Sequence, residues 1–189
     1  MAQYNPETHH RRSIRLKEYD YSQCGAYFIT ICCQSKQCLF GEINTGKMQL
    51  NEAGMAILKW YKELPNKFTD IKICENIIMP NHTHAIIVNV GADLCVCPDA
   101  EYNENVEHAP RQGEHAGSPL PRMLQWFKTM TTNEYIRGVK DNGWKRFDGK
   151  LWQRNYYEHI IRNDDEYLRI ANYVINNPLN WEEDNLWTN

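Results

Sequence analysis

The sequence predicts an α+β fold in which helices pack on one face of an antiparallel, ferredoxin-like sheet. Short β-branched and aromatic runs alternate with longer segments of helical periodicity, in the order strand, strand, helix, strand, strand, helix, helix. The chain has 189 residues, of which 42% are hydrophobic and 24% are charged, as in a globular domain. We therefore expect residues 1–189 to form a single domain.

The first half of the chain contains most of the expected strands. The run AYFITICC at 26–33 is apolar throughout and lies between Gly25 and Gln34, which predicts a buried central strand. Asn51 is a suitable N-cap for the first helix, which we expect to end at Pro65. The elements expected here are a strand at 26–33, a strand at 39–43 with a return at 48–50 after the turn 44–46, a helix at 51–65 with Met55, Leu58, Tyr61 and Leu64 on its apolar face, and hairpin strands at 71–79 and 82–90.

The second half begins with a segment that breaks every periodic pattern. Residues 91–118 carry six acidic residues and one arginine, with few large apolar residues, which predicts a flexible acidic insertion loop. Two helices are expected after it. They are a helix at 120–139 with Met123, Trp126, Phe127 and Met130 on its apolar face, and a helix capped by Asp164 or Asp165 that ends before Pro178, with Tyr167, Ile170, Ala171 and Val174 on its apolar face.

Composition also bears on where the protein works. No apolar run approaches the roughly 18 to 20 residues that cross a bilayer, and residues 1–17 lack the hydrophobic stretch of a signal peptide. The seven cysteines are odd in number, and without a secretory signal we expect them to be reduced thiols. The sequence therefore favours a cytoplasmic protein without membrane association.

A histidine pair opens the second strand of the expected hairpin. Because strand side chains alternate, His82 and His84 point to the same face, and Thr83 points to the other. Neutral imidazole is a common metal ligand, so the pair is a candidate for two ligands of one metal ion. Two hydrogen-bonded surface histidines are the alternative. Thr83 would place a hydroxyl in the core, where it needs a hydrogen-bond partner.

Tyr173 and Asn177 lie four residues apart near the end of the last helix, which puts them on one helical face. A phenol is a weak nucleophile at neutral pH, but a nearby divalent cation stabilises the phenolate and polarises a bound phosphate. The amide of Asn177 is a candidate third metal ligand. The alternative is ordinary packing, since the chain has eleven tyrosines.

Basic and aromatic residues concentrate in the same half of the chain. Residues 119–162 contain nine basic and four acidic residues, although the whole chain has a net charge of −3. Such a surface favours a polyanion, with a simple solvated face as the alternative. The residues that we expect to hold phosphates or stack on unpaired bases are Arg122, Lys128, Trp152, Arg154, Tyr157 and Arg162.

Three motifs occur in order along the chain: IMPNHTHAIIV at 78–88, LWQRNYYEHIIR at 151–162, and Tyr173-x-x-x-Asn177-Pro178. Together they resemble the single-tyrosine HUH transposases, most closely the REP-associated tyrosine transposases, over about residues 12–181. Two positions depart from that family's pattern. Thr83 stands where a bulky hydrophobic residue is usual, and Asn177 stands where many relatives have glutamine.

The resemblance implies a transposase that nicks single-stranded DNA, often beside a hairpin, with Mg²⁺ or Mn²⁺. It implies that His82, His84 and Asn177 hold the metal, and that Tyr173 attacks phosphorus to give a 5′-phosphotyrosine and a free 3′-OH. Strand transfer would follow, in DNA transposition or in the processing of hairpin repeats. Tyr157 is the alternative nucleophile. The competing function is a single-stranded nucleic-acid-binding module without catalysis, and a monomer and a homodimer are both open.

Overall fold

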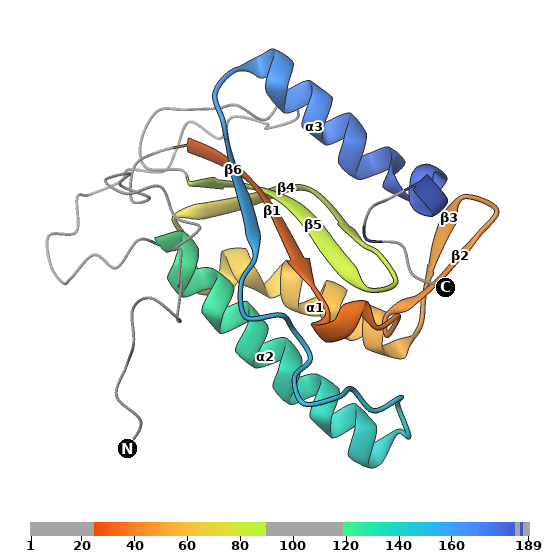
Figure 1. Ribbon diagram of the computed structural model, residues 1–189. Coiled ribbons are helices and arrows are strands. Elements are labelled where there is room, and N and C mark those ends of the chain that lie inside the picture. The colour runs from red at the N-terminus through yellow and green to blue at the C-terminus, as the bar shows by residue number, and fades with distance from the viewer. Residues whose placement is uncertain (1–24, 90–118, 184–185, 187–189) are drawn as a thin grey trace, which may run out of the picture.

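A four-stranded antiparallel sheet forms the centre of the fold, with strand order β4-β5-β1-β6 (Figure 1). This computed structural model describes residues 25–89, 119–183 and 186. The strands are β1 (Gly25–Cys32), β4 (Ile71–Ile78), β5 (His82–Asn89) and β6 (Tyr157–Ile161). In chain order the four strands are arranged 2-3-1-4, as in a ferredoxin-like sheet. The α+β class and the inner position of the first strand are therefore confirmed. The predicted insertion at 91–118 lies outside the described residues.

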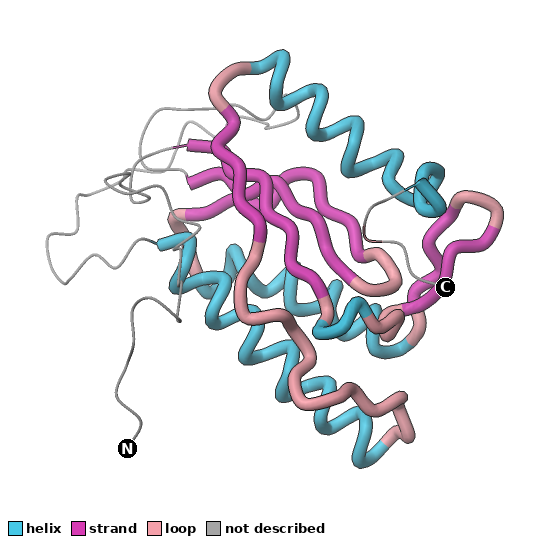
Figure 2. Tube along the Cα trace, viewed as in Figure 1, coloured by secondary structure: helices cyan, strands magenta, loops and turns pink. Residues whose placement is uncertain are grey.

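Three helices cover this sheet, and they lie on both of its faces (Figures 1 and 2). The helices are α1 (Glu52–Lys67) and α2 (Pro119–Asp141) on one face and α3 (Asp164–Asn176) on the other. The smaller elements are the 3₁₀ turns η1 (Gln34–Lys36) and η2 (Asn177–Glu183) and the separate ribbon of β2 (Gly41–Asn44) and β3 (Lys47–Leu50). The expectation that all helices pack on one face is wrong for α3.

The reason lies in the two inner strands, which are apolar on both faces. Ile29 and Ile87 belong to the cluster beneath α1 and α2, whereas Phe28 and Ile86 belong to the cluster beneath α3. A strand buried on both faces appears in sequence as an unbroken apolar run rather than as an alternation. The run at 26–33 therefore indicates a sheet covered on both sides.

The edge strand β6 was not predicted. It pairs with β1 from Thr30↔Tyr157 to Ala26↔Ile161, in a segment for which the sequence predicts no strand. The strand has only five residues, and Glu158 and His159 interrupt its apolar pattern. Its signal was the β-branched and aromatic content of YYEHII.

The helix boundaries correct two further details. Asn51 caps α1 as expected, because its side chain accepts a hydrogen bond of 2.9 Å from the Gly54 N–H. The helix passes through Pro65 and ends at Lys67. Its buried face consists of Ala53, Gly54, Ile57, Tyr61 and Leu64, whereas the predicted Met55 is 55% exposed.

The N-cap of helix α3 lies one residue before the first of the two predicted caps. Asn163, and not Asp164 or Asp165, accepts the capping hydrogen bond, at 2.9 Å from the Glu166 N–H. The two aspartates lie in the first turn, where their negative charges interact favourably with the positive end of the helix dipole. All four predicted apolar residues of this helix are buried.

The prediction of reduced thiols holds for three of the four described cysteines. Cys74, on the edge strand β4, is disulfide-bonded, so the expectation of reduced thiols is wrong for this residue. Cys32, Cys33 and Cys38 carry reduced thiols that form no disulfide within the described part of the chain. Within the described ranges, no helix has the length and apolar content to cross a membrane.

The hydroxyl of Thr83 has the partner that its burial requires. Thr83 lies on the α1 side of β5, and its Oγ1 is 2.8 Å from the hydroxyl of Tyr61, with both residues buried. Burial raises the pKa of Tyr61, and the hydrogen bond to Thr83 offsets only part of that shift. Tyr61 is therefore a neutral phenol that links α1 to the strand bearing the histidines.

We expect Tyr61→Phe to lower the free energy of unfolding by about 1–3 kcal/mol, because it leaves the buried Thr83 hydroxyl without its partner. The double variant Tyr61→Phe/Thr83→Val should cost less than the sum of the two single variants, because it removes both polar groups. Urea denaturation of the four proteins measures this coupling. Strictly additive losses would show that the hydrogen bond contributes nothing.

Candidate active site

The two histidines converge on one point on the α3 side of the sheet. His82 and His84 are the first and third residues of β5, so the alternation of the strand points both rings to that side, as the sequence predicts. Their Nε2 atoms are 3.0 Å apart, and the rings are buried, with 0% and 2% exposure. Burial of this extent holds the two nitrogens in fixed positions.

Asn81 sets the tautomer of His82. The Asn81 amide nitrogen donates to the carbonyl oxygens of Lys36 and Leu186, at 3.1 and 2.8 Å. Its Oδ1 is therefore the atom that faces His82 Nδ1, at 2.8 Å, and it accepts a hydrogen bond from that ring N–H. The Nε2 of neutral His82 is consequently deprotonated and directs its lone pair toward His84.

Thr30 and Phe28 hold His84 from the neighbouring strand. Thr30 is the direct partner of His84 in the β1–β5 register, and its hydroxyl is 2.8 Å from His84 Nδ1. Phe28 stacks on the imidazole with ring centroids 5.3 Å apart. Burial lowers the pKa of His84 well below its usual value, and the nearby His82 acts in the same direction. His84 is therefore a neutral imidazole, the form that binds a metal ion.

Tyr173 approaches this pair from α3. Its hydroxyl is 3.4 Å from His84 Nε2, and its ring centroid is 5.3 Å from that of His84. Unlike the histidines, Tyr173 is 46% exposed. Tyr173 thus lies between the buried histidine pair and the protein surface.

Packing and a short polar network fix α3 in this place. Ile170 and Val174 are buried against the sheet together with Phe28. At the start of the helix, Glu166 accepts hydrogen bonds from the ring of His159, at 2.8 Å, and from the backbone N–H of Arg162, at 2.9 Å. The edge strand and the helix are therefore joined just before the turns that position Tyr173.

Asn177 occupies the C-cap of α3 and is 2% exposed. It lies four residues after Tyr173, which contacts His84, and four before Trp181, whose ring centroid is 5.8 Å from that of His82. The chain therefore passes along the histidine pair from Tyr173 to Trp181, with Asn177 midway.

The donor set suits a divalent cation. Two nitrogens bound side by side to one octahedral ion at about 2.1 Å would lie about 3.0 Å apart. The separation of the two Nε2 atoms is 3.0 Å. Among the described residues there is no cluster of three or more His, Cys, Asp or Glu side chains that would form a metal centre of its own. The predicted third ligand, Asn177, would add an amide oxygen to the two imidazole nitrogens.

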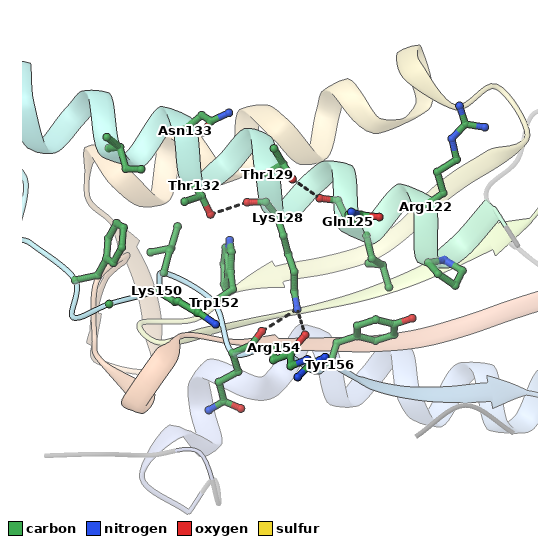
Figure 3. Close-up of a pocket in the computed structure, with 17 residues that line it drawn as sticks. Arg122, Gln125, Lys128, Thr129, Thr132, Asn133, Lys150, Trp152, Arg154 and Tyr156 are labelled. Atoms are coloured by element: carbon green, nitrogen blue, oxygen red, sulfur yellow. Dashed lines mark hydrogen bonds between the residues drawn. The ribbon is translucent and has the colours of Figure 1, made fainter. Parts of the chain in front are cut away.

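The predicted nucleic-acid-binding residues fall into three groups. Arg122, Lys128, Trp152 and Arg154 line a separate cleft between α2 and the segment 147–154 (Figure 3). Tyr157 is 54% exposed on the histidine side, with its ring centroid 6.2 Å from that of Phe28. Arg162 follows β6, near the start of α3.

Sequence reasoning missed the residues that orient the histidines. Asn81 lies between the two expected hairpin strands, and the sequence predicts no role for it. Its position directly before His82 is nevertheless a signal that the two side chains are neighbours. Thr30 and Phe28 carry no such signal, because only the register of β1 against β5 brings them to His84.

The network around Glu166 predicts how stability depends on pH. The Arg162 N–H and the His159 ring lower the pKa of the Glu166 carboxyl below its usual 4.5. Its contribution to folding is therefore present above pH 4.5 and is lost as the pH falls through the lowered pKa. In thermal melts, Glu166→Gln should be less stable than the wild type at neutral pH, and the gap should narrow in acid. A gap that does not change with pH would contradict this assignment.

Comparison with known proteins gives one full-length relative and weaker transposase matches. A Haemophilus influenzae protein of uncharacterized function is 39% identical over 189 residues, covering 98% of both chains. A second Haemophilus influenzae protein, named "Putative REP-associated tyrosine transposase", is 25% identical over 165 residues, covering 85% of this chain and 73% of its own. A solved REP-associated tyrosine transposase bound to a REP hairpin gives a TM-score of 0.47 at 17% identity, covering 95% of this chain and 73% of that one. No protein-family model matches the chain.

Proposed function

This chain belongs to the same family as the Haemophilus influenzae protein that shares 39% of its sequence, and it resembles the REP-associated tyrosine transposases; we propose that it is a transposase-like, DNA-processing enzyme. The finer proposal is a metal-dependent endonuclease and strand transferase for single-stranded DNA. The single observation that supports it best is the position of Tyr173, a half-exposed tyrosine whose hydroxyl is 3.4 Å from Nε2 of His84, one of two buried, convergent imidazoles.

The chemistry would proceed through Tyr173. Its hydroxyl oxygen attacks the phosphorus of a scissile phosphodiester, a new phosphorus–oxygen bond forms, and the bond from phosphorus to the 3′ oxygen breaks. The phenolic proton leaves to solvent, and the 3′ oxygen takes up a proton to become a free 3′-OH. The product is a 5′-phosphotyrosine. Attack on it by another 3′-OH reverses these steps and rejoins strands.

The surrounding residues hold the reactants. His82, His84 and the amide oxygen of Asn177 would bind Mg²⁺ or Mn²⁺, which would polarise the phosphate and stabilise the phenolate. Asn81 and Thr30 keep the two imidazoles in a fixed orientation, at 2.8 Å each. The packing of α3 keeps the phenol facing that point, so the nucleophile needs no large movement to reach a bound phosphate.

The first test is the formation of a covalent adduct. Incubated with a labelled single-stranded hairpin oligonucleotide and Mn²⁺, the wild-type protein should give a DNA-linked band on a denaturing gel. Tyr173→Phe should abolish that band, because it removes only the attacking oxygen. Tyr157→Phe is the matched control and should keep it. Tight binding of the oligonucleotide without any adduct would instead favour the binding module without catalysis.

The second test concerns the third ligand. Asn177→Ala should raise the Mn²⁺ concentration needed for half-maximal adduct formation by about tenfold or more, as loss of one ligand does. Asn177→Gln, which extends the amide by one methylene, should need less Mn²⁺ than Asn177→Ala. An unchanged Mn²⁺ requirement in both variants would remove Asn177 from the metal site and leave the histidines in place.

A further inference from the structure

A second site lies in the cleft between α2 and the segment 147–154, on the side of the sheet away from Tyr173. Its volume is about 1250 Å³. Residues from α2 form one wall, and Lys150, Trp152, Arg154 and Tyr156 contribute to the other (Figure 3). The cleft belongs to the α1 and α2 layer, because Leu124 and Trp152 pack in the same cluster as Ile29.

The charge of this cleft has one sign. Arg122, Lys128, Lys150 and Arg154 line it, and none of its described lining residues is acidic. Arg122, Lys150 and Arg154 are exposed, and they form no ion pair within the part of the chain that the structure describes. Three cations without acidic partners around one cavity favour a ligand with several negative charges.

Lys128 has a different task in the same cleft. Its Nζ donates to the backbone carbonyl oxygens of Gln153 at 2.9 Å and Arg154 at 3.2 Å, which ties the two walls together (Figure 3). Burial lowers its pKa from 10.5 to about 8, an effect that nearby Cys32 partly offsets. The opposite wall is therefore braced, and the cleft exists before any ligand arrives.

The shape of the cleft fits an extended strand better than a compact ligand. The lining residues of α2 recur along one helical face from Arg122 through Gln125 and Thr129 to Asn133. Eleven residues of helix rise about 16 Å. That length accommodates a short run of nucleotides along an extended backbone, as in other grooves that bind single strands.

The edge strand connects this cleft to the catalytic side. Tyr156 lines the cleft, with its ring 5.5 Å from Lys128 Nζ. The next residue, Tyr157, lies on the opposite side of the sheet against Phe28. Two consecutive tyrosines of this edge segment therefore lie on opposite sides of the sheet, one at the cleft and one on the side that carries Tyr173.

We propose that this cleft binds the sugar-phosphate backbone of a short run of single-stranded DNA, flanking the nucleotide that reaches Tyr173 across β6. The inference rests on the proposed function only in taking DNA as the substrate. Arg122 and Arg154 hold phosphates from the two walls, and they act in binding and not in the chemical step.

The test compares Arg122→Ala/Arg154→Ala with Arg137→Ala/Arg146→Ala, which removes two exposed arginines that do not line the cleft. Binding of a fluorescent single-stranded oligonucleotide is measured in EDTA over a range of salt concentrations. The cleft variant should bind roughly tenfold more weakly, and its salt slope should fall by about 1.4, or 0.7 for each lost phosphate contact. The control should match the wild type, and Arg122→Lys/Arg154→Lys should recover most of the affinity.

A separate readout keeps this inference distinct from the proposed chemistry. With saturating DNA and Mn²⁺, the Arg137→Ala/Arg146→Ala control should form the adduct at the wild-type rate, whereas the cleft variant should need a higher DNA concentration for half-maximal adduct formation. Equal affinity of the cleft and control variants would overturn the inference and leave the tyrosine chemistry intact. An affinity loss in a protein that forms no adduct would support the cleft and refute the enzyme. A wild-type protein that binds no DNA would overturn both.

Discussion

The burial of β5 on both faces is the constraint on which the fold and the site depend. Every residue from His82 to Asn89 is buried, so neighbouring side chains must serve opposite layers. Thr83 faces the α1 layer and forms a hydrogen bond with Tyr61, while His82 and His84 face α3. A shift of one residue in the register would exchange these roles, placing the histidines in the core and the threonine in the site.

The same constraint explains why the histidines are well oriented. An inner strand has neighbours on both sides, and those neighbours supply Thr30 and Phe28 from β1. The turn before the strand supplies Asn81, whose side chain donates hydrogen bonds to the backbone carbonyls of Lys36 and Leu186, far apart in the chain. A hydrogen bond to the other ring nitrogen of a histidine fixes which nitrogen is protonated, and so fixes the tautomer before any ion binds. Tyr173 differs because it comes from a helix and is partly exposed, which suits the nucleophile role that we propose for it.

The sequence was most informative where one residue type has one structural use. The alternation of His82 and His84, the partner required by Thr83 and the buried face of α3 all followed from periodicity and burial. Placement of α3 on the second face, the strand β6 and the cleft could not be predicted in this way. Each depends on which segments pack together across long stretches of chain. Lys128 illustrates this limit. Its charge predicts a phosphate contact, whereas its Nζ donates to three backbone carbonyl oxygens.

Mass spectrometry of the wild-type adduct tests the central claim most directly, since it identifies the nucleophile without any mutation. Trypsin cleaves after Arg169, and the remaining peptide 170–189 contains Tyr173 as its sole tyrosine. Tyr156 and Tyr157 lie in the separate peptide 155–162. We predict a nucleotide mass on peptide 170–189 after digestion of the Mn²⁺ reaction with nuclease and trypsin. The same mass on peptide 155–162, or on neither peptide, would contradict the assignment of Tyr173.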